Sequence, residues 1–282
     1  MEPGNPRDGD FELVTLRNGA RAVRHLGHGE VMHPSIGPWE EAKRLYVEQP
    51  GLAGLLREPG PPLVILDVGL GAATNAVAAL TCARELGAGR RRGLEVVSLE
   101  KDLAPLRLAL ADAAGFPFLQ PFREAAEALM RDGAWEAEGV RWRLLGGDAL
   151  GHLQGALPRA DLVFFDPFSP ASNPEMWTVA VLEQVRACCR EDGAGALLMT
   201  YSAATPTRVT LLLAGFYVGA GLSTGTKGET TIAATRRDSL AVPLGERWLE
   251  RWRRSSARAP HGGTLTPEAE ARILAHPQWR QG

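Results

Sequence analysis

The sequence predicts an α/β fold built on an open, mostly parallel, Rossmann-like sheet. Two short runs, 63–66 and 160–165, are dominated by apolar residues on both faces, as buried parallel strands are. Each run leads directly into an aspartate, Asp67 or Asp166. Open α/β sheets bind their ligands beyond the carboxyl ends of their strands. Both aspartates are therefore candidate site residues, and the alternative for Asp166 is a simple turn cap.

Composition places the chain among globular proteins with one large domain and short additions. It has 282 residues, of which 45% are hydrophobic and 23% charged, and its net charge of -2 excludes a grossly basic nucleic-acid binder. Its three cysteines lack metal-ligand or disulfide-framework spacing, so we expect no metal. No apolar run approaches the length of a membrane span, and the N-terminus is unlike a signal peptide. We expect a cytoplasmic protein with no membrane partner.

The N-terminal segment predicts a β-hairpin extension of the main fold. Residues 11–16 and 20–23 alternate in polarity around Asn18-Gly19, the strongest short-range signal for a hairpin. We expect residues 1–9 to be disordered. We assign residues 10–60 to the hairpin and a cap segment.

After the hairpin comes a loop with several potential ligands. It contains His28 and His33, but their spacing and the following Pro34 disfavour a metal-binding helix. We expect this loop to close over a pocket. A helix is then expected from about Pro38 to Leu45.

A glycine-rich turn follows the strand that ends at Asp67. Gly69 and Gly71 allow a tight turn and let the backbone approach a ligand at the start of an alanine-rich helix. Gly-x-Gly alone is a weak signal. It gains weight because the next predicted strand, 94–99, ends at Glu100. A carboxylate there can accept hydrogen bonds from both hydroxyls of a ribose.

Acidic residues end four predicted strands, because Asp148 follows the strand 140–145 in the same way. Four carboxylates at one sheet edge would repel a dinucleotide pyrophosphate, which favours S-adenosylmethionine over NAD as the cofactor. A final antiparallel hairpin, at about 215–221 and 230–235, is typical of class I methyltransferases. We assign residues 61–243 to this Rossmann-like domain.

The last segment, 244–282, is expected to be a basic helical tail. Residues 245–254 form an amphipathic helical pattern rich in arginine, and a second short helix is expected from Pro267. These arginines could contact RNA phosphates. A solvated charged face is the alternative.

One motif is more specific than the strand-end acids: Asp166-Pro167-Phe168-Ser169-Pro170-Ala171-x-Asn173-Pro174-x-Met176-Trp177. With this motif, the glycine loop and Glu100-Lys101, the chain resembles the methyltransferase domain of the MnmC family over most of residues 10–240. It looks like a stand-alone form without the oxidase domain. Where the family commonly has Asp-Gly-Phe-Ala-Pro, this chain has Pro167 and Ser169, and Ala73 replaces a third glycine.

The resemblance implies methyl transfer from S-adenosylmethionine to the primary amine of 5-aminomethyl-(2-thio)uridine at the tRNA wobble position. The partner would be the tRNA anticodon loop. An alkylamine reacts only when deprotonated, and its ordinary pKa is about 10. Asp166 is the candidate catalytic residue, accepting a hydrogen bond or proton from that amine.

The pattern and the resemblance together assign the remaining site residues. Those expected to bind the cofactor are Asp67, Gly69, Gly71, Asn75, Glu100, Lys101, Asp148 and Ala149. Those expected to bind substrate are Pro167, Phe168, Trp177 and Lys227. Core packing is the alternative for the two aromatic residues, and a solvated turn is the alternative for the lysine.

Three other functions remain compatible with the sequence. These are a different amino-methyltransferase, a spermidine-synthase-like aminopropyl transferase on the same fold, and a non-catalytic RNA-binding module. The intact glycine loop and strand-end acids disfavour the last. The sequence does not fix the oligomeric state.

Overall fold

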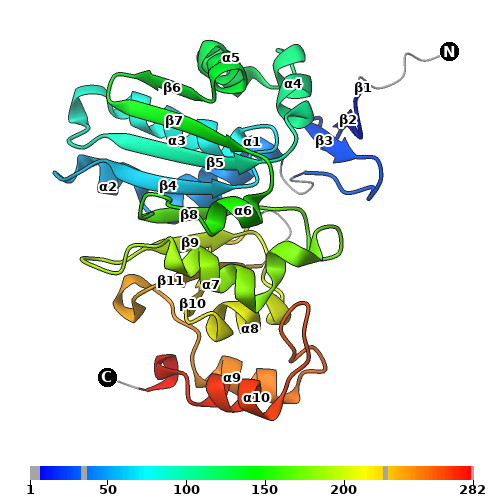
Figure 1. Ribbon diagram of the computed structural model, residues 1–282, viewed down its shortest axis with the longest axis vertical. Coiled ribbons are helices and arrows are strands. Elements are labelled where there is room, and N and C mark those ends of the chain that lie inside the picture. Colours follow the sequence, from blue (N-terminus) through cyan, green and yellow to red (C-terminus); the bar gives the residue numbers. More distant parts are fainter. Residues whose placement is uncertain (1–6, 33–36, 225–227, 281–282) are drawn as a thin grey trace.

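The computed structural model describes residues 7–32, 37–224 and 228–280, and its centre is one twisted eight-stranded sheet (Figure 1). Its strands in sheet order are β10 (Tyr217–Gly221), β11 (Thr230–Ala234), β9 (Leu197–Thr200), β8 (Leu162–Phe165), β4 (Leu63–Val68), β5 (Leu94–Glu100), β7 (Val140–Gly146) and β6 (Ala134–Ala137).

The strand pairing gives the sheet a topological switch point. Strands β7, β5, β4, β8 and β9 are mutually parallel, and β11 and β6 run antiparallel to their neighbours. The chain proceeds from β4 to β5, which pairs with one edge of β4, and β8 later pairs with the other edge of β4. A crevice therefore opens at the carboxyl end of β4, which is the usual ligand position in such sheets. This confirms the predicted Rossmann-like fold and its closing hairpin.

Helices cover both faces of the sheet and bury a separate core on each. One layer contains α1 (Pro38–Ala42), α2 (Leu52–Arg57), α3 (Thr74–Leu86), α4 (Ala104–Ala111) and α5 (Arg123–Asp132). The other contains α6 (Ala149–Leu153), α7 (Val179–Ala187) and α8 (Thr205–Leu213). Within β8, Phe164 packs into the first core and Phe165 into the second, as strand alternation requires.

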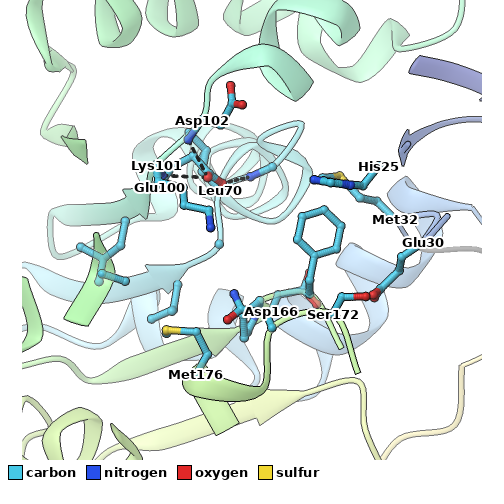
Figure 2. Close-up of a pocket in the computed structure, with 18 of the residues that line it drawn as sticks. His25, Glu30, Met32, Leu70, Glu100, Lys101, Asp102, Asp166, Ser172 and Met176 are labelled. Atoms are coloured by element: carbon cyan, nitrogen blue, oxygen red, sulfur yellow. Dashed lines mark hydrogen bonds between the residues drawn. The ribbon is translucent and has the colours of Figure 1, made fainter. Parts of the chain in front are cut away.

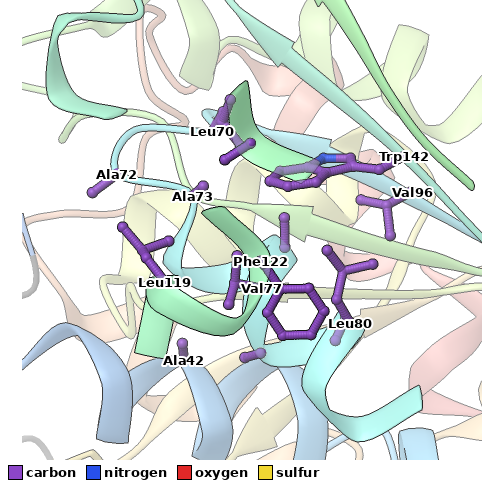
Figure 3. Close-up of a cluster of buried hydrophobic side chains, with 14 of the residues drawn as sticks. Ala42, Leu70, Ala72, Ala73, Val77, Leu80, Val96, Leu119, Phe122 and Trp142 are labelled. Atoms are coloured by element: carbon purple, nitrogen blue, oxygen red, sulfur yellow. The ribbon is translucent and has the colours of Figure 1, made fainter. Parts of the chain in front are cut away.

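Helix α3 is the centre of the first core. Figure 3 shows its Val77 and Leu80 beside Leu119 and Phe122, with Trp142 of β7 nearby. The predicted helix at Pro38 is present and continues beyond α1 as a π-helical segment over Lys43–Glu48. Because α3 is firmly packed, the position where it begins, just after the glycine loop, is fixed.

The predicted N-terminal hairpin is confirmed as β2 (Phe11–Thr15) paired with β3 (Arg21–His25). The predicted disorder is wrong for Arg7–Asp8, which form strand β1 on the edge of β2. Arg107 of α4 holds this edge through a 2.6 Å ion pair with Asp8. The hairpin is thus fastened to the main domain at α4.

The C-terminal segment, predicted to be a basic helical tail, packs against the second core. Helix α9 (Glu246–Arg254) and α10 (Pro267–Leu274) bury Trp248, Trp252 and Ile273 in the second core. The side chain of Gln278 accepts from the Val218 nitrogen at 2.6 Å and donates to the Val218 oxygen at 2.8 Å. It thereby satisfies backbone groups at the edge of β10. Within the described ranges, no helix is both long and apolar enough to span a bilayer.

Candidate active site

A cavity of about 510 Å³ lies at the carboxyl ends of β4, β5 and β8. Figure 2 shows Glu100 and Asp166 on different walls, with His25, Met32 and Glu30 of the N-terminal segment on another side. The strand ends supply one half of the cavity, which we call the cofactor half. The loop after β8, together with the hairpin and α1, supplies the other half, which we call the acceptor half.

The glycine turn in the cofactor half has two conformational requirements. Gly69 has φ of 92°, and a Cβ atom there would lie 2.7 Å from the backbone oxygen of Asp166. Only glycine allows β4 and the loop after β8 to approach this closely. Ala73, at the entry to α3, has a left-handed backbone with φ of 60°. The family's glycine at this position would adopt that conformation without steric cost.

Glu100 organises the cofactor half through backbone hydrogen bonds. Its carboxylate accepts from the nitrogens of Gly71 at 2.9 Å, Lys101 at 2.8 Å and Asp102 at 3.1 Å. Burial raises the pKa of Glu100, and these three donors act in the opposite direction. A carboxylate has about four acceptor positions, so capacity remains for a ribose hydroxyl. This donor set fits the nucleoside part of S-adenosylmethionine.

The other residues expected to bind the cofactor divide between the wall and the core. Asn75, Lys101, Asp148 and Ala149 all line the cavity, and Asp148 also caps α6 by accepting from Leu150 at 3.1 Å. Asp67 is different.

Asp67 lies beneath the cavity, fully buried, and does not line it. Ser98 donates to its carboxylate at 2.7 Å and accepts from Trp142 at 3.0 Å. Burial raises the pKa of Asp67 to about 8. The expected cofactor contact is corrected here: Asp67 precedes the last residue of β4, so the neighbouring strands enclose it. The structure gives it a supporting position below Glu100 and Asp166.

Asp166 occupies the predicted position just beyond β8 and lines the acceptor half. Its backbone nitrogen donates to Val68 at 3.0 Å, and the Asn75 amide donates to its carboxylate at 2.7 Å. Asn75 is in the first turn of α3, so the cofactor loop and the candidate base are directly linked. Burial and the nearby Asp166 carboxylate raise the pKa of Tyr46 and Tyr201.

The loop after Asp166 is held by the N-terminal hairpin. Ser169 donates to the carboxylate of Glu30 through its nitrogen at 2.9 Å and its hydroxyl at 2.8 Å. The Phe168 ring meets His25 edge-on at 5.6 Å and stacks on Phe11 at 6.4 Å. Burial, followed by the proximity of His28, lowers the pKa of His25. Ser169, one of the departures from the family pattern, therefore has a defined partner.

Of the predicted substrate residues, two line the cavity, one is buried in the core and one lies outside the described residues. Pro167 and Phe168 form part of its wall. Trp177 is fully buried below the loop, where its ring packs on Phe165 and its indole nitrogen donates to the Phe168 oxygen at 2.8 Å. Base stacking by Trp177 is thus corrected to core packing, because the loop folds back over the ring. Lys227 lies outside the described residues.

Several cavity residues could not be identified from sequence. Four of them, His25, Glu30, Met32 and Glu41, precede the first strand of the large sheet, and the fifth, Tyr201, directly follows β9. The only signal for Glu30 and Met32 was the expectation that the loop after the hairpin closes over a pocket. Glu30 and Met32 of that loop do line the cavity.

The cavity is acidic. Its described wall has one lysine, Lys101, and eight carboxylates: Asp10, Glu30, Glu41, Glu100, Asp102, Asp148, Asp166 and Glu175. Such a surface favours cationic ligands and repels phosphate. Both the sulfonium of S-adenosylmethionine and a protonated alkylamine meet this requirement. Within the described ranges, no group of three or more metal-binding side chains is assembled.

Comparison with known proteins agrees with this geometry. The profile of a family described as S-adenosyl-L-methionine-dependent methyltransferase matches residues 119–236. Two similar proteins are named tRNA 5-methylaminomethyl-2-thiouridine biosynthesis bifunctional protein MnmC. The one from Methylibium petroleiphilum is 32% identical over 267 residues, covering 89% of this chain and 39% of the relative. The one from Chromobacterium violaceum is 33% identical over 233 residues, covering 79% and 34%.

A solved structure extends the match to nearly the whole chain. The crystal structure of MNMC2 from Aquifex aeolicus has a TM-score of 0.73 at 26% identity, covering 97% of this chain and 86% of that one. The chain spans less than two fifths of the length of the two bifunctional relatives. These matches favour methyl transfer over aminopropyl transfer and over a non-catalytic module. The chain is an S-adenosylmethionine-dependent methyltransferase, and it is homologous to the methyltransferase portion of the MnmC proteins.

Proposed function

We propose that this chain methylates the primary amine of 5-aminomethyl-(2-thio)uridine at the tRNA wobble position, as a cytoplasmic enzyme. The names of the MnmC relatives support this substrate class. The observation that carries the proposal is the 2.7 Å hydrogen bond between Asn75 and Asp166. It fixes a candidate base for an amine at the junction of the two halves of the cavity.

The cofactor half has the groups that S-adenosylmethionine needs. When bound, S-adenosylmethionine supplies an electrophilic methyl group on its sulfonium. Glu100 accepts from a ribose hydroxyl, and the turn from Gly69 to Gly71 allows close backbone approach. Asp148 and Ala149, where α6 begins, line the same cavity as Glu100.

The acceptor half must hold an amine and remove a proton from it. An alkylamine is mostly protonated at neutral pH, because its ordinary pKa is about 10. The Asp166 carboxylate accepts a hydrogen bond from the ammonium and then its proton, which releases the lone pair for attack. Asn75 keeps the carboxylate oriented during this step. Holding amine and methyl in line accounts for a further part of the rate enhancement.

The nucleobase has to enter the acceptor half away from its stack. Enzymes that modify a base bind it unstacked, and aromatic side chains commonly contact its face. Phe168, in the loop after β8, lines the cavity, and its ring meets His25 edge-on. We assign Phe168 to contact with the uracil.

RNA contact by α9 stays a prediction. Trp248 and Trp252 face the core, which leaves Arg247, Arg251 and Arg254 on the exposed side of α9. Figure 1 places α9 at the opposite end of the molecule from β2 and β3, which border the cavity. If these arginines contact tRNA phosphates, tRNA affinity will fall steeply with salt while cofactor affinity will not.

The test is methylation of a defined RNA by the purified protein. We expect an anticodon stem-loop carrying 5-aminomethyluridine to gain one methyl group from S-adenosylmethionine, detected by nucleoside mass spectrometry. The same RNA with unmodified uridine is the matched control and should gain none. Absence of transfer to the aminomethyl RNA by a protein that binds S-adenosylmethionine would reject this substrate.

A further inference from the structure

A second carboxylate, Glu41, faces the acceptor half from α1. Its side chain lines the cavity, and the residue is only 3% exposed. Because α1 packs against α3, Glu41 approaches the cavity beside the helix whose Asn75 holds Asp166. Two acidic residues from segments more than a hundred residues apart thus line the same cavity.

The electrostatic environment places Glu41 and Asp166 in one region. Both carboxylates contribute to raising the pKa of Tyr46, after burial, and both also contribute to raising that of Tyr201. Two carboxylates that share a site repel each other, and a cation bound between them relieves that repulsion. Glu30, the third acid near Tyr201, is hydrogen bonded to Ser169.

We propose that Glu41 is a specificity-determining residue, which together with Asp166 selects an acceptor carrying a cationic amine over a neutral acceptor of the same shape. The inference rests on the proposed function, because it assigns the charge preference of that same site. The two acids have different tasks. Asp166 binds the amine and accepts its proton, whereas Glu41 contributes attraction in the bound state and does not take part in proton transfer.

Binding measurements can isolate this preference from turnover. The probes are two anticodon stem-loop RNAs, identical except that one carries 5-aminomethyluridine and the other 5-hydroxymethyluridine. Affinity is measured with S-adenosylhomocysteine present, so that no methyl transfer occurs. The protein should bind the aminomethyl RNA about 10- to 100-fold more tightly, the range for hydrogen bonds to a charged group. Glu41→Gln should reduce this ratio to a few-fold, and it should raise KM for the aminomethyl RNA more than it lowers kcat.

Two further variants separate charge from structure. Glu41→Asp keeps the negative charge and should restore most of the preference. Glu40→Gln changes the neighbouring residue of α1, which is exposed and paired with Lys43, and should leave the ratio unchanged. S-adenosylhomocysteine affinity should be the same in all of these proteins. A Glu41→Gln variant that loses that affinity would place Glu41 in the cofactor half or in the scaffold, and would overturn the proposal.

The remaining outcomes distinguish this inference from the function on which it rests. If the unmodified protein methylates the aminomethyl RNA and Glu41→Gln keeps the full preference, the role of Glu41 is overturned and the function stands. If the unmodified protein neither methylates nor prefers the aminomethyl RNA, both the proposed function and the role of Glu41 are overturned.

Discussion

The two halves of the cavity are held together by different kinds of contact. In the cofactor half, Glu100 is fixed by three backbone nitrogens, and a glycine turn brings two strand ends together. In the acceptor half, side chains from distant segments hold the loop after β8: Asn75, from the cofactor half, holds Asp166, and Glu30 holds Ser169. Backbone contacts follow from the fold itself, whereas side-chain contacts depend on the residue at each position.

This difference separates what the fold determines from what the sequence can vary. Many different side chains could occupy the loops of such a sheet without disturbing the three backbone hydrogen bonds to Glu100. The acceptor half changes whenever the hairpin or the loop after β8 changes, so substrate choice is expected to depend on that half. The following predictions test this division, from the largest expected effect to the smallest.

Asp166→Asn should slow methyl transfer far more than it weakens cofactor binding. The amide keeps the shape of the side chain but cannot accept the proton of the amine. General-base catalysis contributes about 10²–10⁴-fold, so single-turnover methylation of the aminomethyl RNA should slow by that factor. Higher pH should partly restore the rate, because free amine then forms without a base. A variant that methylates at the unmodified rate would reduce Asp166 to a turn cap.

Gly69→Ala should destabilise the protein and impair both halves at once. A methyl group there would meet the Asp166 oxygen at 2.7 Å in a backbone conformation unfavourable for alanine. Strain and overpacking together should lower the free energy of unfolding by about 2–5 kcal/mol, measured by urea denaturation. Gly146→Ala is the control, because its added Cβ would meet no atom within 4 Å. Equal stability of the two variants would show that the turn can open at little cost.

The sequence predicts the residues of the cofactor half better than those of the acceptor half. Strand-end acids at 100, 148 and 166 could be placed on the cavity because hydrophobic runs define strands, and the carboxyl ends of parallel strands share one edge. Asp67 follows the same pattern but pairs with Ser98 and Phe164, two positions before Glu100 and Asp166, so it stays within the sheet. The sequence does not show how far each strand extends relative to its neighbours, and this decides whether the side chain reaches the cavity.

The acceptor half could be predicted only in part, for physical reasons. Glu30 and Glu41 reach the cavity because the hairpin docks on α4 and α1 packs on α3, and these tertiary contacts leave no local periodicity. Trp177 follows Met176, which also packs in the second core, and together they begin an apolar pattern that continues into α7. That pattern favours core packing of Trp177, whereas the motif around it predicts contact with the substrate.

Glu100→Ala should weaken S-adenosylmethionine binding by about 1.5–3 kcal/mol, the range for a hydrogen-bond partner that carries charge. Calorimetry measures this directly. Glu100→Gln keeps an acceptor oxygen for the backbone nitrogens and should lose less affinity, which separates ribose binding from support of the loop. If the Glu100→Ala variant is folded and binds the cofactor normally, Glu100 only supports the turn and does not bind the ribose.

Ser169→Ala should affect the acceptor half alone. It removes the 2.8 Å hydroxyl bond to Glu30 but keeps the 2.9 Å backbone bond. Loss of one such bond costs about 0.5–1.5 kcal/mol, so KM for the aminomethyl RNA should rise by roughly 2- to 13-fold. Cofactor affinity should stay constant. A loss of cofactor affinity equal to the rise in KM would contradict the separate roles of the two halves.

Ala73→Gly should change stability least, although it restores a glycine that the family pattern favours. Glycine relieves the left-handed strain of Ala73, about 1–2 kcal/mol. Against this, the unfolded chain gains entropy worth about 0.4–1 kcal/mol, and a fully buried methyl contributing about 0.8 kcal/mol is lost. These contributions nearly cancel, so the free energy of unfolding, measured by urea denaturation, should change by less than about 0.5 kcal/mol. A gain above about 1 kcal/mol would show that the methyl is poorly packed and that the cofactor half carries unrelieved strain.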